Sequence, residues 1–149
     1  MAKAISKNFL SNEFDCQCSP PCNTEFTVDS QLIKILQAIR DAIGQPLRVS
    51  SGVRCAVRNK ATPGAAKRSF HVPRDGVLYA ADIQLLDPTN RNIKTALAIY
   101  SLADQHDATG GLGLYSNRCH IDTRQRATKG QERARWIDKS VNLSTLYKA

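Results

Sequence analysis

The stretch SFHVPRDGVLYAADIQLL, residues 69–86, sets the architecture that the sequence predicts. In its second half apolar residues alternate with small or polar ones, which predicts a strand over about residues 77–86 with one apolar face. Asp82 then points away from that apolar face. The first half belongs to a segment rich in proline and glycine, and residues 56–76 are therefore expected to be mostly loop.

Helices are predicted on both sides of this strand in the chain. Apolar residues recur at steps of three and four over Val28–Ile43, which is typical of a helix packed on a core, and Thr27 or Asp29 can cap it. A second helix is expected over about residues 91–105, with Asn90 as its cap. Both helices are scaffold and carry no candidate chemistry.

Three more short strands are expected, over residues 47–50, 112–115 and 119–123, the last two as a hairpin. In the last strand His120 and Asp122 share one face, because side chains alternate along a strand. Helices and short strands follow one another without strict alternation. The predicted fold class is therefore α+β, with a small, mostly antiparallel sheet and flanking helices.

The length of 149 residues suits a single domain over residues 1–149, in which residues 1–27 form an irregular N-terminal segment. No apolar run is long enough to cross a bilayer, so no stable membrane insertion is expected. The first lysines are not followed by the apolar stretch of a secretory signal, which predicts a protein made in the cytoplasm without a signal peptide. We expect a monomer.

The net charge is +8, from 21 basic and 13 acidic residues, and residues 117–139 carry about half of it. Such a surplus favours polyanionic partners, among them nucleic acid, membrane surfaces and anionic cell-wall polymers. Nucleic acid is the weaker choice, because aromatics make up 6% of the residues and are not interleaved with the basic positions. A basic run can also be no more than a solvated surface.

Five cysteines are present, and Cys16, Cys18 and Cys22 lie close together in the chain. An odd number excludes a full disulfide framework. Together with Cys55 these three could bind a second, structural zinc ion. The spacing C-x-C-x3-C is looser than paired C-x-x-C motifs, however, so free thiols are the favoured interpretation.

The sequence holds three histidines, and two of them lie in polar, strand-associated settings. A hydrolytic zinc site takes three ligands from His and Asp or Glu and keeps a fourth position for water. His71, Asp82 and His120 meet this requirement if the strands of Asp82 and His120 are neighbours. Judged by residue type alone, the three could equally be structural. His106 follows a predicted helix end, where a helix-dipole partner is a better interpretation than a catalytic base.

Two short motifs resemble the S-x-H-x-x-G-x-A-x-D signature of the peptidase M15 family, the zinc D-alanyl-D-alanine carboxypeptidases and related phage endolysins. They are Ser69-Phe70-His71 and, after it in the chain, Ala80-Ala81-Asp82-Ile83. The likeness covers about residues 8–136 in order and implies the fold shared by hedgehog domains and DD-peptidases. Three further segments are similar to members of that family: residues 8–18 (NFLSNEFDCQC), 49–59 (VSSGVRCAVRN) and 111–124 (GLGLYSNRCHIDTR).

The resemblance implies a role for each candidate residue. His71, Asp82 and His120 would bind one catalytic zinc ion, and Arg54 would bind a substrate carboxylate or the developing oxyanion. Two features depart from the family. The spacing from His71 to Asp82 is eleven where seven is common, which implies an enlarged loop beside the metal. Asn117 stands where many relatives place the Glu or Asp that acts as general base.

Asp122 is the best substitute for that base, because it shares a strand face with His120. It could accept the proton of the attacking water, or it could only orient the ligand His120, as carboxylates next to metal sites often do. The sequence leaves both roles open.

The function that the resemblance implies is zinc-dependent hydrolysis of peptidoglycan stem peptides, of DD-carboxypeptidase or L-Ala-D-Glu endopeptidase type. A phage endolysin is expected first, made in the host cytoplasm and acting on the anionic cell wall after the membrane is permeabilised. The alternatives are a bacterial carboxypeptidase that remodels the wall, and a catalytically silent zinc-binding module that docks on walls.

Overall fold

Helix α1 (Ser30–Ile43) presents its apolar stripe to the core of the computed structural model, which describes residues 2–142 and 144. Of the two predicted caps, Asp29 is the one used, and its carboxylate accepts a hydrogen bond from the backbone N–H of Leu32. The helix ends at Gly44, whose φ of +69° is a left-handed conformation that glycine adopts without strain. Its buried side chains are Leu32, Ile35, Leu36 and Ile39.

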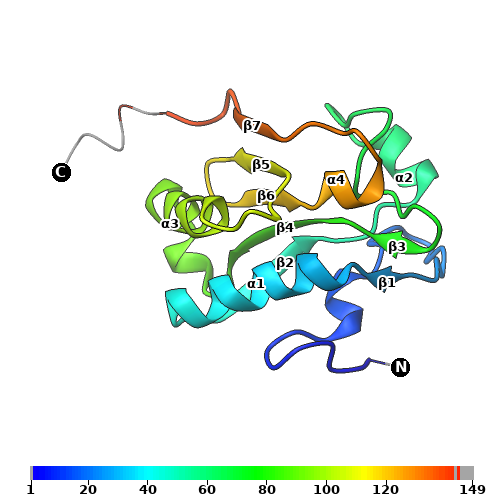
Figure 1. The fold of residues 1–149 in the computed structure, drawn as a ribbon, viewed down its shortest axis with the longest axis horizontal. Coiled ribbons are helices and arrows are strands. Elements are labelled where there is room, and N and C mark those ends of the chain that lie inside the picture. The colour runs from blue at the N-terminus through cyan, green and yellow to red at the C-terminus, as the bar shows by residue number, and fades with distance from the viewer. Residues whose placement is uncertain (1, 143, 145–149) are drawn as a thin grey trace.

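A five-stranded sheet forms the centre of the fold (Figure 1). All neighbouring strands in it are antiparallel except β5 and β7, which run parallel. The predicted α+β class with a mostly antiparallel sheet is thus confirmed. In spatial order the strands are β2 (Leu47–Ser51), β4 (Ala80–Leu85), β6 (Cys119–Asp122), β5 (Gly111–Leu114) and β7 (Ala134–Ile137).

The register of the sheet divides its side chains into two sets. Asp82 on β4 is directly opposite His120 on β6, so the two polar side chains emerge on the same face. The strands' opposite face is apolar, and its side chains join those of α1 and α3 (Ile93–Asp104) in one hydrophobic core. The helices therefore cover one face of the sheet and leave the other for the site.

The predicted strand over residues 77–86 is interrupted at Tyr79. Its first part, β3 (Val77–Leu78), pairs in parallel with β1 (Thr27–Val28) in a small second sheet, and only its second part is β4. The N-terminal segment is also more structured than predicted. It contains a 3-10 helix, η1 (Ser11–Phe14), and the buried rings of Phe9 and Phe14 belong to the core.

Two predictions about helices were wrong in detail. Helix α3 is capped by Asn92 and not by Asn90, because Asn90 ends a 3-10 turn, η2 (Pro88–Asn90), that the Asp87 carboxylate caps. Residues 56–76 are not all loop, since α2 (Ala56–Ala61) forms before the first proline of that segment. Its Ala, Arg and Lys residues are good helix formers, a signal that the nearby prolines and glycines obscured.

Helix α4 (Arg124–Ala127) and strand β7 follow the predicted hairpin and were not predicted. Strand β7 alternates between half-buried and exposed residues in a polar setting, so its sequence carries only a weak strand signal. Its position is decided by parallel pairing with β5, a long-range contact. Among residues 2–142 and 144, no helix combines the length and apolar character needed to cross a membrane.

Candidate metal centre

Three side chains meet on the open face of the sheet, where β4 and β6 lie side by side. Nε2 of His71 is 3.2 Å from Oδ1 of Asp82 and 3.2 Å from Nδ1 of His120, and that Nδ1 is 3.2 Å from the same carboxylate oxygen. All three residues are buried, and each directs one ligand atom at a common point. The structure thus brings together the three residues that the sequence singled out.

His71 lies in the loop before β3, and its ring is held from behind by the strand end of β2. Its Nδ1–H donates a hydrogen bond of 2.8 Å to the backbone carbonyl of Gly52. The backbone N–H of Arg54 in turn donates to the carbonyl of His71 at 2.8 Å, so the two segments are joined at two points. Because a carbonyl only accepts, Nδ1 carries the proton and the lone pair of Nε2 faces Asp82.

His120 is oriented by a carboxylate. Its Nε2–H donates to Oδ2 of Asp122 at 2.7 Å, which leaves Nδ1 free to face Asp82 and His71. Asp122 is fully buried, and its remaining lone pairs accept from the backbone N–H of Gly111 at 2.7 Å and from the backbone and guanidinium of Arg124. Both oxygens of Asp122 are therefore occupied within the protein.

Burial and these contacts act in opposite directions on the pKa values of the site. Burial would raise the pKa of Asp82, but His71 and His120 outweigh it and hold that pKa well below its usual range. Burial would lower the pKa of His120, yet hydrogen bonds to Asp122 and Asp82 raise it to about 9. The pKa of Asp122 is likewise lowered, against burial, by His120 and Arg124.

The donor set fits zinc. Two imidazole nitrogens and one carboxylate oxygen are the ligands of a hydrolytic zinc site, and each imidazole has its second nitrogen fixed by a hydrogen bond. The rise in the pKa of His120 has the same origin, since the carboxylates of Asp122 and Asp82 that would favour a metal ion also favour a proton on the imidazole between them. The site therefore favours a cation at the point where the three ligand atoms converge.

Trp136 lies beside the centre, a position that was not predicted from the sequence. Its ring lies 5.1 Å from the ring of His120, centroid to centroid. It reaches that position across β5 because residue 113 is glycine, and a Cβ there would overlap the indole. Gly111 makes room in the same way for Asp122 and the guanidinium of Arg124. Two alternate glycines in a strand are a sequence signal for such close approaches.

A cavity of about 820 Å³ opens over the ligands. It is bordered by more cations than anions, and the carboxylates among its described lining residues are Asp82 and Asp138. Asp138 follows β7, two positions after Trp136, and its Oδ2 accepts a hydrogen bond from the backbone N–H of Ser140. The cations are Arg54, Arg68, Arg118, Arg124 and Lys139.

Arg54 lies half-buried at the border of this cavity. Its guanidinium donates a hydrogen bond of 3.0 Å to the side-chain oxygen of Asn59, and within residues 2–142 and 144 it forms no ion pair. Arg54 is therefore not held in place by a surface salt bridge, which would be the simple structural explanation for an arginine at this position. Donors that Asn59 does not engage are available to a negatively charged ligand.

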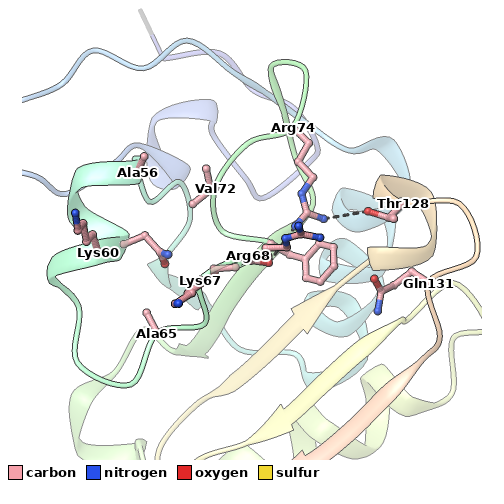
Figure 2. Close-up of a pocket in the computed structure, with 12 residues that line it drawn as sticks. Ala56, Lys60, Ala65, Lys67, Arg68, Val72, Arg74, Thr128 and Gln131 are labelled. Carbon is pink, nitrogen blue, oxygen red and sulfur yellow. Dashed lines mark hydrogen bonds between the residues drawn. The ribbon is translucent and has the colours of Figure 1, made fainter.

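A second cavity, of about 970 Å³, adjoins the first along the loop that carries His71, and Figure 2 shows the side chains that line it. It shares Ala65, Arg68, Ser69 and Phe70 with the first cavity, and no carboxylate is among its described lining residues. Figure 2 shows the Arg74 guanidinium directed at Thr128, to which it donates a hydrogen bond of 3.2 Å. The cationic side chains around it are Lys60, Lys67, Arg68 and Arg74.

Other candidates lie outside this centre. His106 is at the C-terminal end of α3, where its backbone N–H donates to the carbonyl of Ala103, and it lines neither cavity. Asn117 lies in the turn between β5 and β6, where its side-chain oxygen accepts a hydrogen bond from Arg118. The four candidate cysteines Cys16, Cys18, Cys22 and Cys55 form a separate cluster.

A histidine from the loop before β3, together with an aspartate and a histidine on the adjacent strands β4 and β6, lies under an open cavity, and this is the ligand set of mononuclear metallohydrolases. Comparison with known families makes the assignment specific. The chain belongs to the peptidase M15 family, whose model matches residues 7–122. The family consists of zinc metallopeptidases that act on peptidoglycan-type substrates, and the match spans all three ligand positions. No curated protein and no solved structure matched the chain in the corresponding comparisons.

Proposed function

We propose that the protein is a zinc peptidase that cleaves the stem peptides of peptidoglycan, as a DD-carboxypeptidase or an L-Ala-D-Glu endopeptidase. The observation that carries this proposal is the convergence of Nε2 of His71, Oδ1 of Asp82 and Nδ1 of His120 at the base of the cavity. Membership of the M15 family supports the substrate class.

His71, Asp82 and His120 would hold the ion, and the carbonyl of Gly52 and the carboxylate of Asp122 keep the two imidazoles in the tautomers that this needs. When bound, zinc supplies Lewis-acid polarisation of a carbonyl and lowers the pKa of water. We assign Asp122 the orienting role, because its two oxygens are already bonded to His120, Gly111 and Arg124 and it is fully buried.

We assign the acceptance of the water's proton to Asp138. Among the described residues that line the cavity, the carboxylates are Asp138 and the ligand Asp82. Asp138 follows the end of β7 and lines the same cavity as Trp136, which contacts His120. An aspartate is ordinarily ionised at neutral pH, and the hydrogen bond from Ser140, which lowers the pKa of Asp138, keeps it so; it can therefore accept a proton.

Arg54 is the residue we assign to substrate binding. Its available donors border the cavity, and a guanidinium binds a carboxylate through two parallel hydrogen bonds. In a carboxypeptidase reaction that carboxylate is the C-terminus of the stem peptide. In an endopeptidase reaction Arg54 would face the oxyanion or an acidic side group of the stem.

The second cavity supports an anionic partner. Four cations surround it, and it shares residues with the cavity above the ligands, so one extended substrate can occupy both. We propose that it receives a negatively charged part of the wall polymer. An endolysin that acts after the membrane is permeabilised suits this arrangement, as does a bacterial carboxypeptidase that remodels the wall.

The test is digestion of purified cell wall, followed by mass spectrometry of the products. The wild type should release free D-alanine if it is a carboxypeptidase, or separate L-Ala from D-Glu if it is an endopeptidase. His71→Ala should lose both activity and zinc. His106→Ala, the matched control at the remaining histidine, should keep both. Full activity in His71→Ala would overturn the proposal.

One observation favours a second candidate function, a catalytically silent module that binds zinc and docks on walls. Asn117 stands where relatives carry a catalytic carboxylate, and Asp122 is engaged in the protein interior. A protein that binds zinc at His71, Asp82 and His120, and binds walls, yet releases no new amino groups from them would be this module.

A further inference from the structure

Four of the five cysteines converge at a second place in the fold. Cys16, Cys18 and Cys22 lie in the segment that follows η1, and Cys55 is the residue immediately before α2. Their four Sγ atoms all lie within 4.8 Å of one another, and all four are free thiols. Segments more than thirty residues apart are thus joined at this point.

The spacing of the sulfurs suits a single tetrahedral ion. With zinc–sulfur bonds of about 2.3 Å, tetrahedral geometry places thiolate sulfurs roughly 3.8 Å apart, so little movement would close the cluster on an ion. A four-iron cubane is larger than one ion and would need the sulfurs farther apart. Tetrahedral sites with four sulfur ligands hold a single zinc or iron ion, and structural sites of this kind are typically zinc sites.

Backbone N–H groups donate to two of the sulfurs, and a hydroxyl lies close to a third. The backbone N–H of Cys22 donates to Sγ of Cys18 at 3.1 Å, and the backbone N–H of Cys55 donates to Sγ of Cys16 at 3.4 Å. Thr24 places its hydroxyl 3.0 Å from Sγ of Cys22. Donors that point at sulfur stabilise the negative charge that metal binding requires.

The segment from Asp15 to Phe26 contains no helix or strand. Its links to the rest of the fold include hydrogen bonds from the Gln17 amide to the carbonyl of Ser50, from Arg58 to the carbonyl of Gln17, and from the backbone N–H of Cys55 to Sγ of Cys16. Cys55 in turn follows Arg54, whose backbone N–H bonds the carbonyl of the metal ligand His71. An ion here would hold the N-terminal segment against the loop that borders the cavity.

We propose that Cys16, Cys18, Cys22 and Cys55 bind a second zinc ion with a structural role. The fourth sulfur comes from a distant part of the chain, so the C-x-C-x3-C spacing of the first three cysteines does not by itself form a typical zinc-binding motif. Cys119 does not take part, because it is buried in the core with its thiol donating to the carbonyl of Ala96 at 2.9 Å. The proposal does not depend on peptidase activity.

The experiment is zinc analysis of the full chain purified under reducing conditions. The wild type should carry two zinc ions per chain, His71→Ala one, and Cys18→Ser/Cys22→Ser one. Cys119→Ser, the matched control, should keep two. One zinc in the wild type that disappears in His71→Ala would overturn the proposal, and so would iron in place of zinc or disulfides that persist in reductant.

A second measurement guards against variants that fail to fold. Cobalt substituted into the wild-type protein should give the intense sulfur-to-cobalt charge-transfer absorption of a thiolate site, which ligands from His and Asp cannot produce. The same absorption should persist in His71→Ala, since the two sites share no ligand. Cobalt-loaded wild type without this absorption would refute the site directly.

Discussion

Asp122→Asn separates the two roles that this carboxylate could have. The change keeps the size of the side chain and an oxygen that can accept from Gly111 and Arg124. It removes the negative charge of the carboxylate, whose Oδ2 accepts a hydrogen bond from Nε2–H of His120 at 2.7 Å. If Asp122 orients His120, the variant should bind zinc at the His71 centre less tightly, because the imidazole loses the partner that fixes its tautomer.

The size of the effect follows from the contacts. Replacing a group that orients a metal ligand costs roughly 10–100-fold in metal affinity, which is about 1.4–2.7 kcal/mol. Stability of the metal-free protein should also fall, since Asp122 is fully buried and pairs with Arg124 at 2.8 Å. Activity at saturating zinc should recover much of its wild-type value.

The assay is competition with a chelator of known zinc affinity, combined with wall hydrolysis at increasing zinc concentrations. Asp29→Asn is the matched control. Asp29 is also buried and pairs with an arginine, Arg126 at 2.9 Å, but it contacts no metal ligand. It should lose stability and keep zinc affinity. If Asp122→Asn retains wild-type zinc affinity and loses turnover at saturating zinc, Asp122 is the base and the orienting role is wrong.

Four other changes test further parts of the site. Gly113→Ala should displace Trp136, the single tryptophan, and destabilise the fold by about 1–3 kcal/mol, which a shift in tryptophan emission and urea unfolding would show; an unchanged emission spectrum would contradict the packing. Asp138→Asn should lower turnover about 100-fold or more while leaving zinc content intact, and wild-type turnover would remove Asp138 as the base. Arg54→Ala should raise KM or lower turnover with a change in stability within about 0.5 kcal/mol, because Arg54 has no ion-pair partner among the described residues; a large loss of stability would indicate a structural role. Burial raises the pKa of Cys119 to about 12, above its unfolded value, so its contribution to stability is complete below pH 9 and declines toward pH 12; the stability difference between wild type and Cys119→Ala should shrink over that range, and a constant difference would refute it.

The elements with strong local signals were predictable. The stripe of α1, its end at Gly44, the strand that carries Asp82 and the strand that carries His120 all appear close to where the sequence places them. Local patterns failed where a long-range partner decides the structure. Strand β7 exists because it pairs with β5, and β3 separates from β4 because it pairs with β1.

The candidate site shows the same division. Histidine and aspartate at these positions, supported by the ordered motifs around them, identified the three candidate ligands before any geometry was known. Of the groups that surround the ligands, the sequence indicated Asp122, as one of its two possible roles, but not the others. The carbonyl of Gly52 and the ring of Trp136 have no residue pattern that ties them to a histidine distant in the sequence.

By itself, the sequence determined the chemistry available to this protein: which side chains can bind a metal, which segments form the main helices and strands, and which face of each is apolar. Only the tertiary structure decided how that chemistry is used. It placed Asp122 behind His120, brought Asp138 to the border of the cavity and joined Cys55 to the N-terminal cysteines. The physical reason is that hydrogen-bond direction and ligand geometry depend on distances between atoms, and the chain order does not set distances between segments that meet only on folding.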